Sequence, residues 1–157
     1  MRFLEETGSD FKRVTLCKTH CAHGDQNLVT SAFYAKTGFS AAACGVIFKA
    51  PEEPLFYLAG DTIYDAGVKE CIERTAPAVV AVNAGGAEFP RGHLLIMNEY
   101  DVWALMQDFP DAEVIDPHVE GVSHATVTRA RLQDFAREHA LSRLHIPGDG
   151  ETLTFKR

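Results

Sequence analysis

The chain has 157 residues, of which 46% are hydrophobic and 24% are charged, values typical of one globular domain. Its 15 Lys and Arg residues against 22 Asp and Glu residues give a formal net charge of -7, which disfavours nucleic-acid binding because that depends on clustered basic side chains. No apolar run approaches the roughly 20 residues that span a bilayer, and no signal core follows the N-terminus, so we expect a cytoplasmic protein without membrane contact.

The first half of the chain predicts strands. A strand is expected over Arg13–Thr19. Gly24–Ala43 is rich in Gly, Ser and Ala with little periodicity, which predicts a long loop or a broken hairpin. Two β-type runs, Cys44–Ala50 and Leu55–Ala59, then flank the turn Pro51–Pro54. Such a pattern predicts a hairpin.

After the hairpin the pattern alternates between helix and strand. Helices are expected over Asp65–Arg74, Met97–Phe109 and Thr126–His139, and strands over Ala78–Val82, Ala112–Ile115, Leu144–Ile146 and Thr152–Phe155. Asn98 and Thr126 are the expected caps of the last two helices. Consecutive βα units predict an α/β protein (α+β by some schemes), with helices packed on a mixed sheet. No repeat or linker divides the chain, so residues 1–157 are expected to form one domain.

In the last predicted helix the apolar residues form an incomplete stripe. Val127, Ala130, Phe135 and Ala136 share one side at helical spacing, and Leu132 falls one position off it.

Four cysteines occur without CxxC spacing: Cys17, Cys21, Cys44 and Cys71. This spacing disfavours an all-cysteine zinc site, and a cytoplasmic location disfavours disulfides. Cys44 and Cys71 lie in apolar or helical surroundings and are expected to be small core residues. Cys21 is kept as an alternative metal ligand, because a thiolate between two histidines would suit zinc.

Polar residues follow three of the predicted strands. His20 and His23 follow the first, Asp61 follows Leu55–Ala59, and His118 follows the strand that ends near Asp116. Active sites of open α/β sheets lie at such strand ends. A hydrolytic metal centre needs imidazoles and carboxylates that converge from rigid elements. His23, Asp61 and His118 suit that requirement, although Asp61 could instead cap the following helix.

Two further segments have alternative interpretations. Asn83–Ala87 is rich in glycine and could cradle a phosphate, but it lacks a nucleotide-binding spacing, so a strand-to-loop turn is the commoner explanation. His124 lies near enough to His118 to orient it or to contact a substrate, and it could equally be an exposed loop residue.

Taken together, these segments resemble the C-terminal portion of the metallo-β-lactamase-fold, metal-dependent hydrolases, the broad group that includes ascorbate-phosphate lactonase-like proteins. The matching runs are His23–Gly24, Tyr57–Thr62, Val82–Gly86, Ile96–Asn98, Pro117–Glu120 with Ser123–His124, and Ile146–Glu151. The resemblance implies half of an αββα sandwich, a mixed sheet with helices packed on one face.

The resemblance also implies roles for residues. In such proteins the aspartate after the central strand bridges two metals and histidines at other strand ends complete the sites. That implies Asp61 and His118 as catalytic residues and metal ligands with His23, and His20, His124 and Asn83 as supporting or substrate-contacting residues. His20 would take the place of His23 as a ligand if the loop that follows the first strand were shifted in register. The metal is commonly zinc, in some members manganese or iron, and its hydroxide attacks an ester, amide, lactone or phosphodiester.

One departure from the family changes these expectations. The family carries an upstream HxHxDH motif, and no HxH occurs in this chain. We therefore expect a half-domain with an incomplete metal centre, and an uncovered apolar sheet face through which two copies form a homodimer. The alternative is a non-catalytic binding or dimerisation module whose ligands are relics and which holds no metal. A doubly wound nucleotide-binding domain is disfavoured, because the early hairpin breaks the βαβ order.

Overall fold

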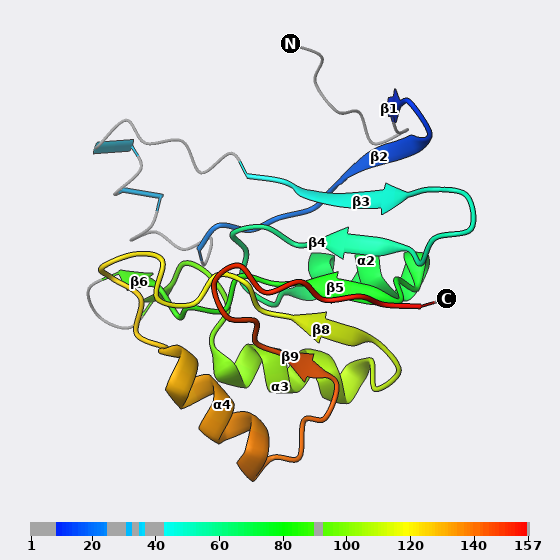
Figure 1. Ribbon diagram of the computed structural model, residues 1–157. Helices are drawn as coiled ribbons and strands as arrows, with labels where there is room; N and C mark the ends of the chain where they lie inside the picture. Colours follow the sequence, from blue (N-terminus) through cyan, green and yellow to red (C-terminus); the bar gives the residue numbers. More distant parts are fainter. Residues whose placement is uncertain (1–8, 25–30, 33–34, 37–42, 90–92, 157) are drawn as a thin grey trace.

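The computed structural model describes residues 9–24, 31–32, 35–36, 43–89 and 93–156. Its main element is a seven-stranded mixed sheet in the order β1-β2-β3-β4-β5-β8-β9 (Figure 1). The strands are β1 (Ser9–Phe11), β2 (Val14–Thr19), β3 (Gly45–Lys49), β4 (Phe56–Leu58), β5 (Val79–Ala81), β8 (Glu113–Ile115) and β9 (Leu144–His145). A separate two-stranded sheet consists of β6 (Glu88–Phe89) and β7 (His93–Leu94).

The sheet has an antiparallel and a parallel part. Strands β1 to β4 pair antiparallel, which confirms the hairpin predicted on either side of Pro51–Pro54. Strands β4, β5, β8 and β9 pair in parallel, as expected for strands joined through helices. The register places Cys17, Ile47, Tyr57, Val80 and Val114 in one row across five strands.

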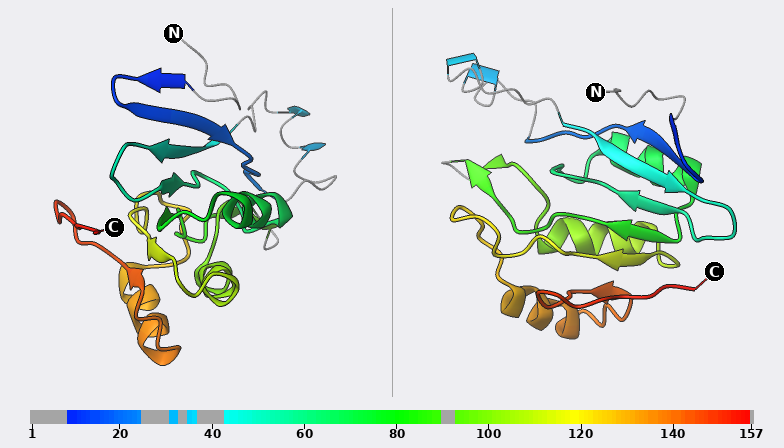
Figure 2. Two further views of the ribbon diagram at one scale, coloured as in Figure 1. Left: turned by 90° about the vertical axis from the view of Figure 1, so that its right-hand side faces the viewer. Right: turned by 45° about the horizontal axis from the view of Figure 1, so that its top comes forward.

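Helices cover the face of the sheet to which that row points. Helix α2 (Ala66–Thr75) and helix α3 (Glu99–Asp108) lie side by side on this face (Figure 2). Their buried residues pack on the row to form the main core, and they include Val68, Ile72, Val102, Leu105 and Met106. Helix α4 (Arg129–Glu138) lies beside β9 and packs in a smaller cluster. The α/β fold with helices on one sheet face is therefore confirmed.

The opposite face of β2, β3 and β4 has no described helix over it (Figure 2). Because successive side chains of a strand alternate between faces, this face carries Leu16, Val46, Phe48, Phe56 and Leu58, all half-buried. The rings of Phe48 and Phe56 lie 5.5 Å apart. We call these five residues the open sheet face.

The helix termini test the two predicted caps. Asn98 caps α3 through the backbone N–H groups of Tyr100 and Asp101, as expected. Thr126 is not the cap of α4, because the hydroxyl of Thr128 accepts the N–H of Arg131 and the helix begins at Arg129.

The C-terminal segment also differs from expectation. Thr152–Phe155 forms no strand, because its backbone has no hydrogen bond to a described strand; its contact with β9 is the ring of Phe155, edge-on to His145 at 5.2 Å. Strand β1 and the β6–β7 pair were not predicted. Most of the Gly24–Ala43 segment lies outside the described residues. Among the helices that are described, none has the length and hydropathy needed to cross a membrane.

Candidate functional site

Three parallel strands bring polar residues to one edge of the sheet. Asp61 follows β4, Asn83 follows β5 and His118 follows β8, and the carboxyl ends of parallel strands meet at the same edge. Gly60 makes the turn after β4 in the left-handed region, with φ 74°. The side-chain amide of Asn83 donates to Oδ1 of Asp61 over 2.6 Å. The structure thus brings Asp61 and Asn83 into direct contact.

His118 is joined to the same edge through Asp116, which no sequence argument singled out. Oδ1 of Asp116 accepts the backbone N–H groups of Ala84 and His118, each over 3.2 Å. Asp116 is 0% exposed, and its Oδ2 has no hydrogen-bond partner among the described residues. Burial raises the pKa of Asp116 to about 6. The only signal in the sequence is an aspartate that ends a strand immediately before Pro117.

His23 reaches this edge from β2. The backbone N–H of Ala22 donates to the buried hydroxyl of Thr62 over 2.9 Å, and the carbonyl of Ala22 accepts the N–H of Ile63 over 3.0 Å. On the other side, the N–H of Gly24 donates to the carbonyl of Leu95 over 2.9 Å. These bonds fix the backbone on both sides of the half-buried His23 next to the Asp61 turn.

His20 and His124 have other surroundings. Nε2 of His20 lies 2.8 Å from Oδ2 of Asp65, and Oδ1 of Asp65 accepts the N–H of Val68 at the start of α2. Asp65 is therefore the cap of this helix, and the alternative that Asp61 caps it is wrong. His124 is exposed.

The burial of the cysteines differs in part from the prediction. Cys71 is buried, as expected, but Cys44 is exposed, since it lies just before β3 begins. The thiol of Cys21 donates to the carbonyl of Asp61 over 3.2 Å, and burial raises its pKa to about 11. This hydrogen bond engages the thiol, and no group of three possible metal donors within the described residues includes Cys21, so the geometry gives no support to its ligand role.

The glycine-rich segment after β5 packs against the chain itself. A side chain at Gly85 would lie 2.9 Å from the backbone oxygen of His118. Gly86 has φ 63°, and its carbonyl accepts the hydroxyl of Thr126 over 2.7 Å. These contacts favour the strand-to-loop turn over a phosphate cradle.

Comparison with known proteins adds independent information. The chain is 31% identical over 146 residues to the UPF0173 protein YddR of Bacillus subtilis (strain 168), a match that covers 92% of this chain. Two solved structures are similar at 30% and 31% identity, an isothiocyanate hydrolase from Delia radicum gut bacteria with a TM-score of 0.87 and a possible metal-dependent hydrolase from Veillonella parvula DSM 2008 with a TM-score of 0.86. The chain is a homologue of this UPF0173 protein and shares its fold with these solved hydrolases.

The chain spans only part of the proteins it matches. It covers 55% of YddR, 59% of the isothiocyanate hydrolase and 56% of the Veillonella protein. A metallo hydrolase of Ignicoccus hospitalis shares the fold at 17% identity and a TM-score of 0.67. No protein-family model matches the chain.

The donors at the strand ends fit a metal by chemical type but not by number. Imidazole and carboxylate are the ligands of catalytic zinc sites, which usually have three protein ligands. Within the described parts of the chain, no three His, Cys, Asp or Glu side chains lie close enough together to hold one ion.

Proposed function

We propose that this chain supplies His23, Asp61 and His118 to the metal centre of a hydrolase, and that donors outside the described residues complete the centre. The metal would be zinc, or else manganese or iron. The substrate would be an ester, a lactone or a phosphodiester. One similar structure is an isothiocyanate hydrolase, so an isothiocyanate belongs in the same substrate screen.

The observation that best supports this proposal is the way in which Asp61 is held. Asn83 donates to Oδ1 of Asp61, and no described residue is hydrogen-bonded to the other carboxylate oxygen. A carboxylate that is oriented through one oxygen keeps the second available for a cation, and partners of this kind fix ligand orientation in metal sites.

The neighbouring residues would act by positioning. Asn83 sets the rotation of the Asp61 carboxylate, and Asp116 ties the backbone of His118 to that of Ala84. A bound divalent metal would supply Lewis acidity and would lower the pKa of a coordinated water. The burial of Asp116 keeps this anchor out of solvent.

Asp61→Asn is expected to weaken zinc binding by about tenfold or more. The amide oxygen can still accept from Asn83, so the fold is retained, but the charge that attracts the ion is lost. Titration calorimetry of the whole chain with zinc, together with elemental analysis, measures the change. Asp111→Asn is the matched control, because Asp111 is exposed and precedes β8, at the opposite end of that strand from His118.

The outcomes of this experiment are distinct. Weaker zinc binding by Asp61→Asn, with unchanged zinc binding by Asp111→Asn, supports a metal centre at the carboxyl ends of the strands. Equal zinc binding by both variants, or no uptake by the unmodified chain in excess zinc, contradicts the proposal. No zinc uptake by the unmodified chain would favour the non-catalytic alternative.

That alternative has one observation of its own, the open sheet face. We propose that, whatever its catalytic state, the chain forms a homodimer through Leu16, Val46, Phe48, Phe56 and Leu58. Aromatic and aliphatic side chains that share one face are typical of an interface core, and buried apolar area stabilises association by about 25 cal/mol per Å² before the entropic costs.

Light scattering at micromolar concentration is expected to give the mass of a dimer. Phe48→Lys should shift it to the monomer, because a charge in an apolar interface loses its hydration. Trp103→Lys is the control, since Trp103 is exposed on α3 and away from this face. A monomeric unmodified chain, or a dimer that persists in a folded Phe48→Lys variant, would exclude the interface.

A further inference from the structure

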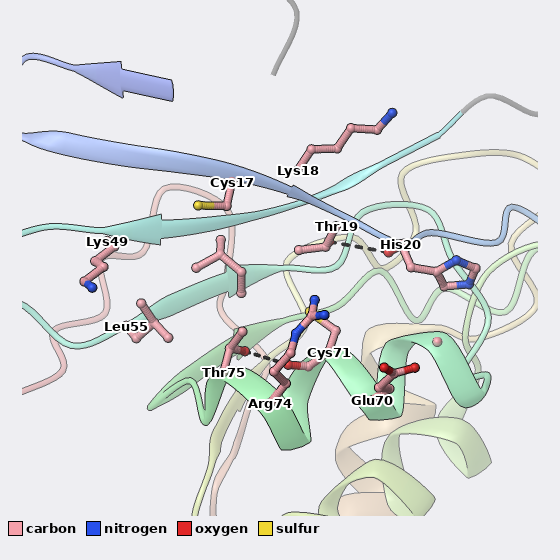
Figure 3. A pocket seen from close by; sticks show the side chains of 12 residues that line it. Cys17, Lys18, Thr19, His20, Lys49, Leu55, Glu70, Cys71, Arg74 and Thr75 are labelled. Carbon is pink, nitrogen blue, oxygen red and sulfur yellow. Dashed lines mark hydrogen bonds between the residues drawn. The ribbon is translucent and has the colours of Figure 1, made fainter. Parts of the chain in front are cut away.

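A cleft separates β2 and β3 from helix α2, on the helix-covered side of the sheet (Figure 3). Its volume is about 790 Å³, within the range of about 300–1,000 Å³ common for small-molecule sites. Cys17, Ile47 and Leu55 form an apolar wall. None of these residues belongs to the candidate metal centre.

The lysine and arginine side chains that line the cleft, Lys18 among them, have no partner of opposite charge among the described residues. Arg74 extends from the last turn of α2 toward the space below β2 (Figure 3), and it forms no ion pair with any described acid. The arginines on and after α4 behave differently, since Arg129, Arg131, Arg137 and Arg143 each pair with a carboxylate. Lys49 lines the cleft and is also unpaired among the described residues.

A buried polar atom lies behind Thr19, one of the residues that line the cleft. Tyr57 is 0% exposed, and its hydroxyl has no hydrogen-bond partner among the described residues. Its ring passes over Gly45, where a side chain would lie 2.9 Å from the ring and 2.4 Å from the hydroxyl of Thr19. Buried hydroxyls are rarely left unpaired, and the neighbouring polar side chain is that of Thr19.

We propose that this cleft binds a small monoanion with a short apolar chain. The anionic group pairs with Arg74, whose planar donors match a carboxylate, and the apolar chain lies against Cys17, Ile47 and Leu55. Glu70 also lines the cleft and the whole chain carries a net charge of -7. These negative charges disfavour a polyanion such as a nucleotide.

Octanoate is a suitable probe, with octan-1-ol as its uncharged counterpart. Titration calorimetry of the full chain should show octanoate binding that weakens by about tenfold or more in Arg74→Gln. Arg74→Lys should bind octanoate more weakly than the unmodified chain but more tightly than Arg74→Gln, because the charge stays at the helix terminus while the planar donors are lost. Arg137→Gln is the control for the loss of one arginine, since Arg137 is exposed on α4. Circular dichroism checks that each variant is folded.

Backbone NMR shifts locate the bound probe. Octanoate-dependent shifts in β2, β3 and α2, with loss of affinity in Arg74→Gln but not in Arg137→Gln, support the site. The proposal is overturned by equal binding of octanol and octanoate, by equal loss in Arg137→Gln, by shifts confined to the open sheet face, or by no binding. None of these outcomes depends on metal uptake, so this site and the proposed metal centre are tested separately.

Discussion

Leu132→Ala is expected to lower the free energy of unfolding by about 3 kcal/mol, within the usual range for a buried leucine. Leu132 is 0% exposed and is the buried residue of α4. It packs with Val119 and Val127, and Leu144 and Ile146 lie against the same cluster. Truncation removes the contact that holds the helix beside β9 and leaves a cavity.

Urea unfolding monitored by circular dichroism measures this change. Gln133→Ala is the control, because Gln133 is the next residue on the same helix and is exposed, and it should alter stability by less than about 0.5 kcal/mol. A loss of less than about 1 kcal/mol in Leu132→Ala would mean that α4 is not docked through this residue.

The same residue shows why the helix was only partly predictable. The apolar spacing predicted a helix from Thr126 with Leu132 off its stripe. The helix begins at Arg129 instead, so Val127 packs from the preceding loop, Ala130 is exposed and Leu132 faces the cluster. Threonine can cap a helix at either position, and the tertiary contact of the apolar side chains decides between them.

The candidate site was predictable where it follows from strand order. An apolar run that ends in a polar residue identified Asp61 and His118, whereas Asn83 was named as a site residue only through the resemblance. The parallel pairing of β4, β5 and β8 brings the three to one edge. The cap of α2 was not predictable, because Asp61 and Asp65 both precede it. The hydrogen bond from the N–H of Val68 to Oδ1 of Asp65 shows which carboxylate is used.

Burial of single polar residues was the least predictable feature. Cys44 lies in an apolar run but is exposed, whereas Asp116 is fully buried. In both cases burial depends on a strand boundary. Strand β3 begins one residue after Cys44, and β8 ends one residue before Asp116. Boundaries of this kind depend on the pairing partner, which lies far away in the sequence.

Arg131→Met is expected to destabilise the fold by about 2 kcal/mol. Glu99, at the start of α3, is 2% exposed, and its Oε1 accepts from Arg131 of α4. Its Oε2 has no partner among the described residues. Removal of the arginine therefore leaves a buried carboxylate without its counter-charge, which typically costs about 3–5 kcal/mol in a buried pair. We expect less here because the Arg131 side chain is 52% exposed.

The chain offers a matched control on the same helix. Arg137 pairs with Asp134, but these side chains are 72% and 70% exposed, so Arg137→Met should change stability by less than about 0.5 kcal/mol. The double variant Glu99→Gln with Arg131→Met should recover part of the loss, because no uncompensated charge remains buried. If Arg131→Met and Arg137→Met were equally stable, the contact between α3 and α4 would not depend on this ion pair.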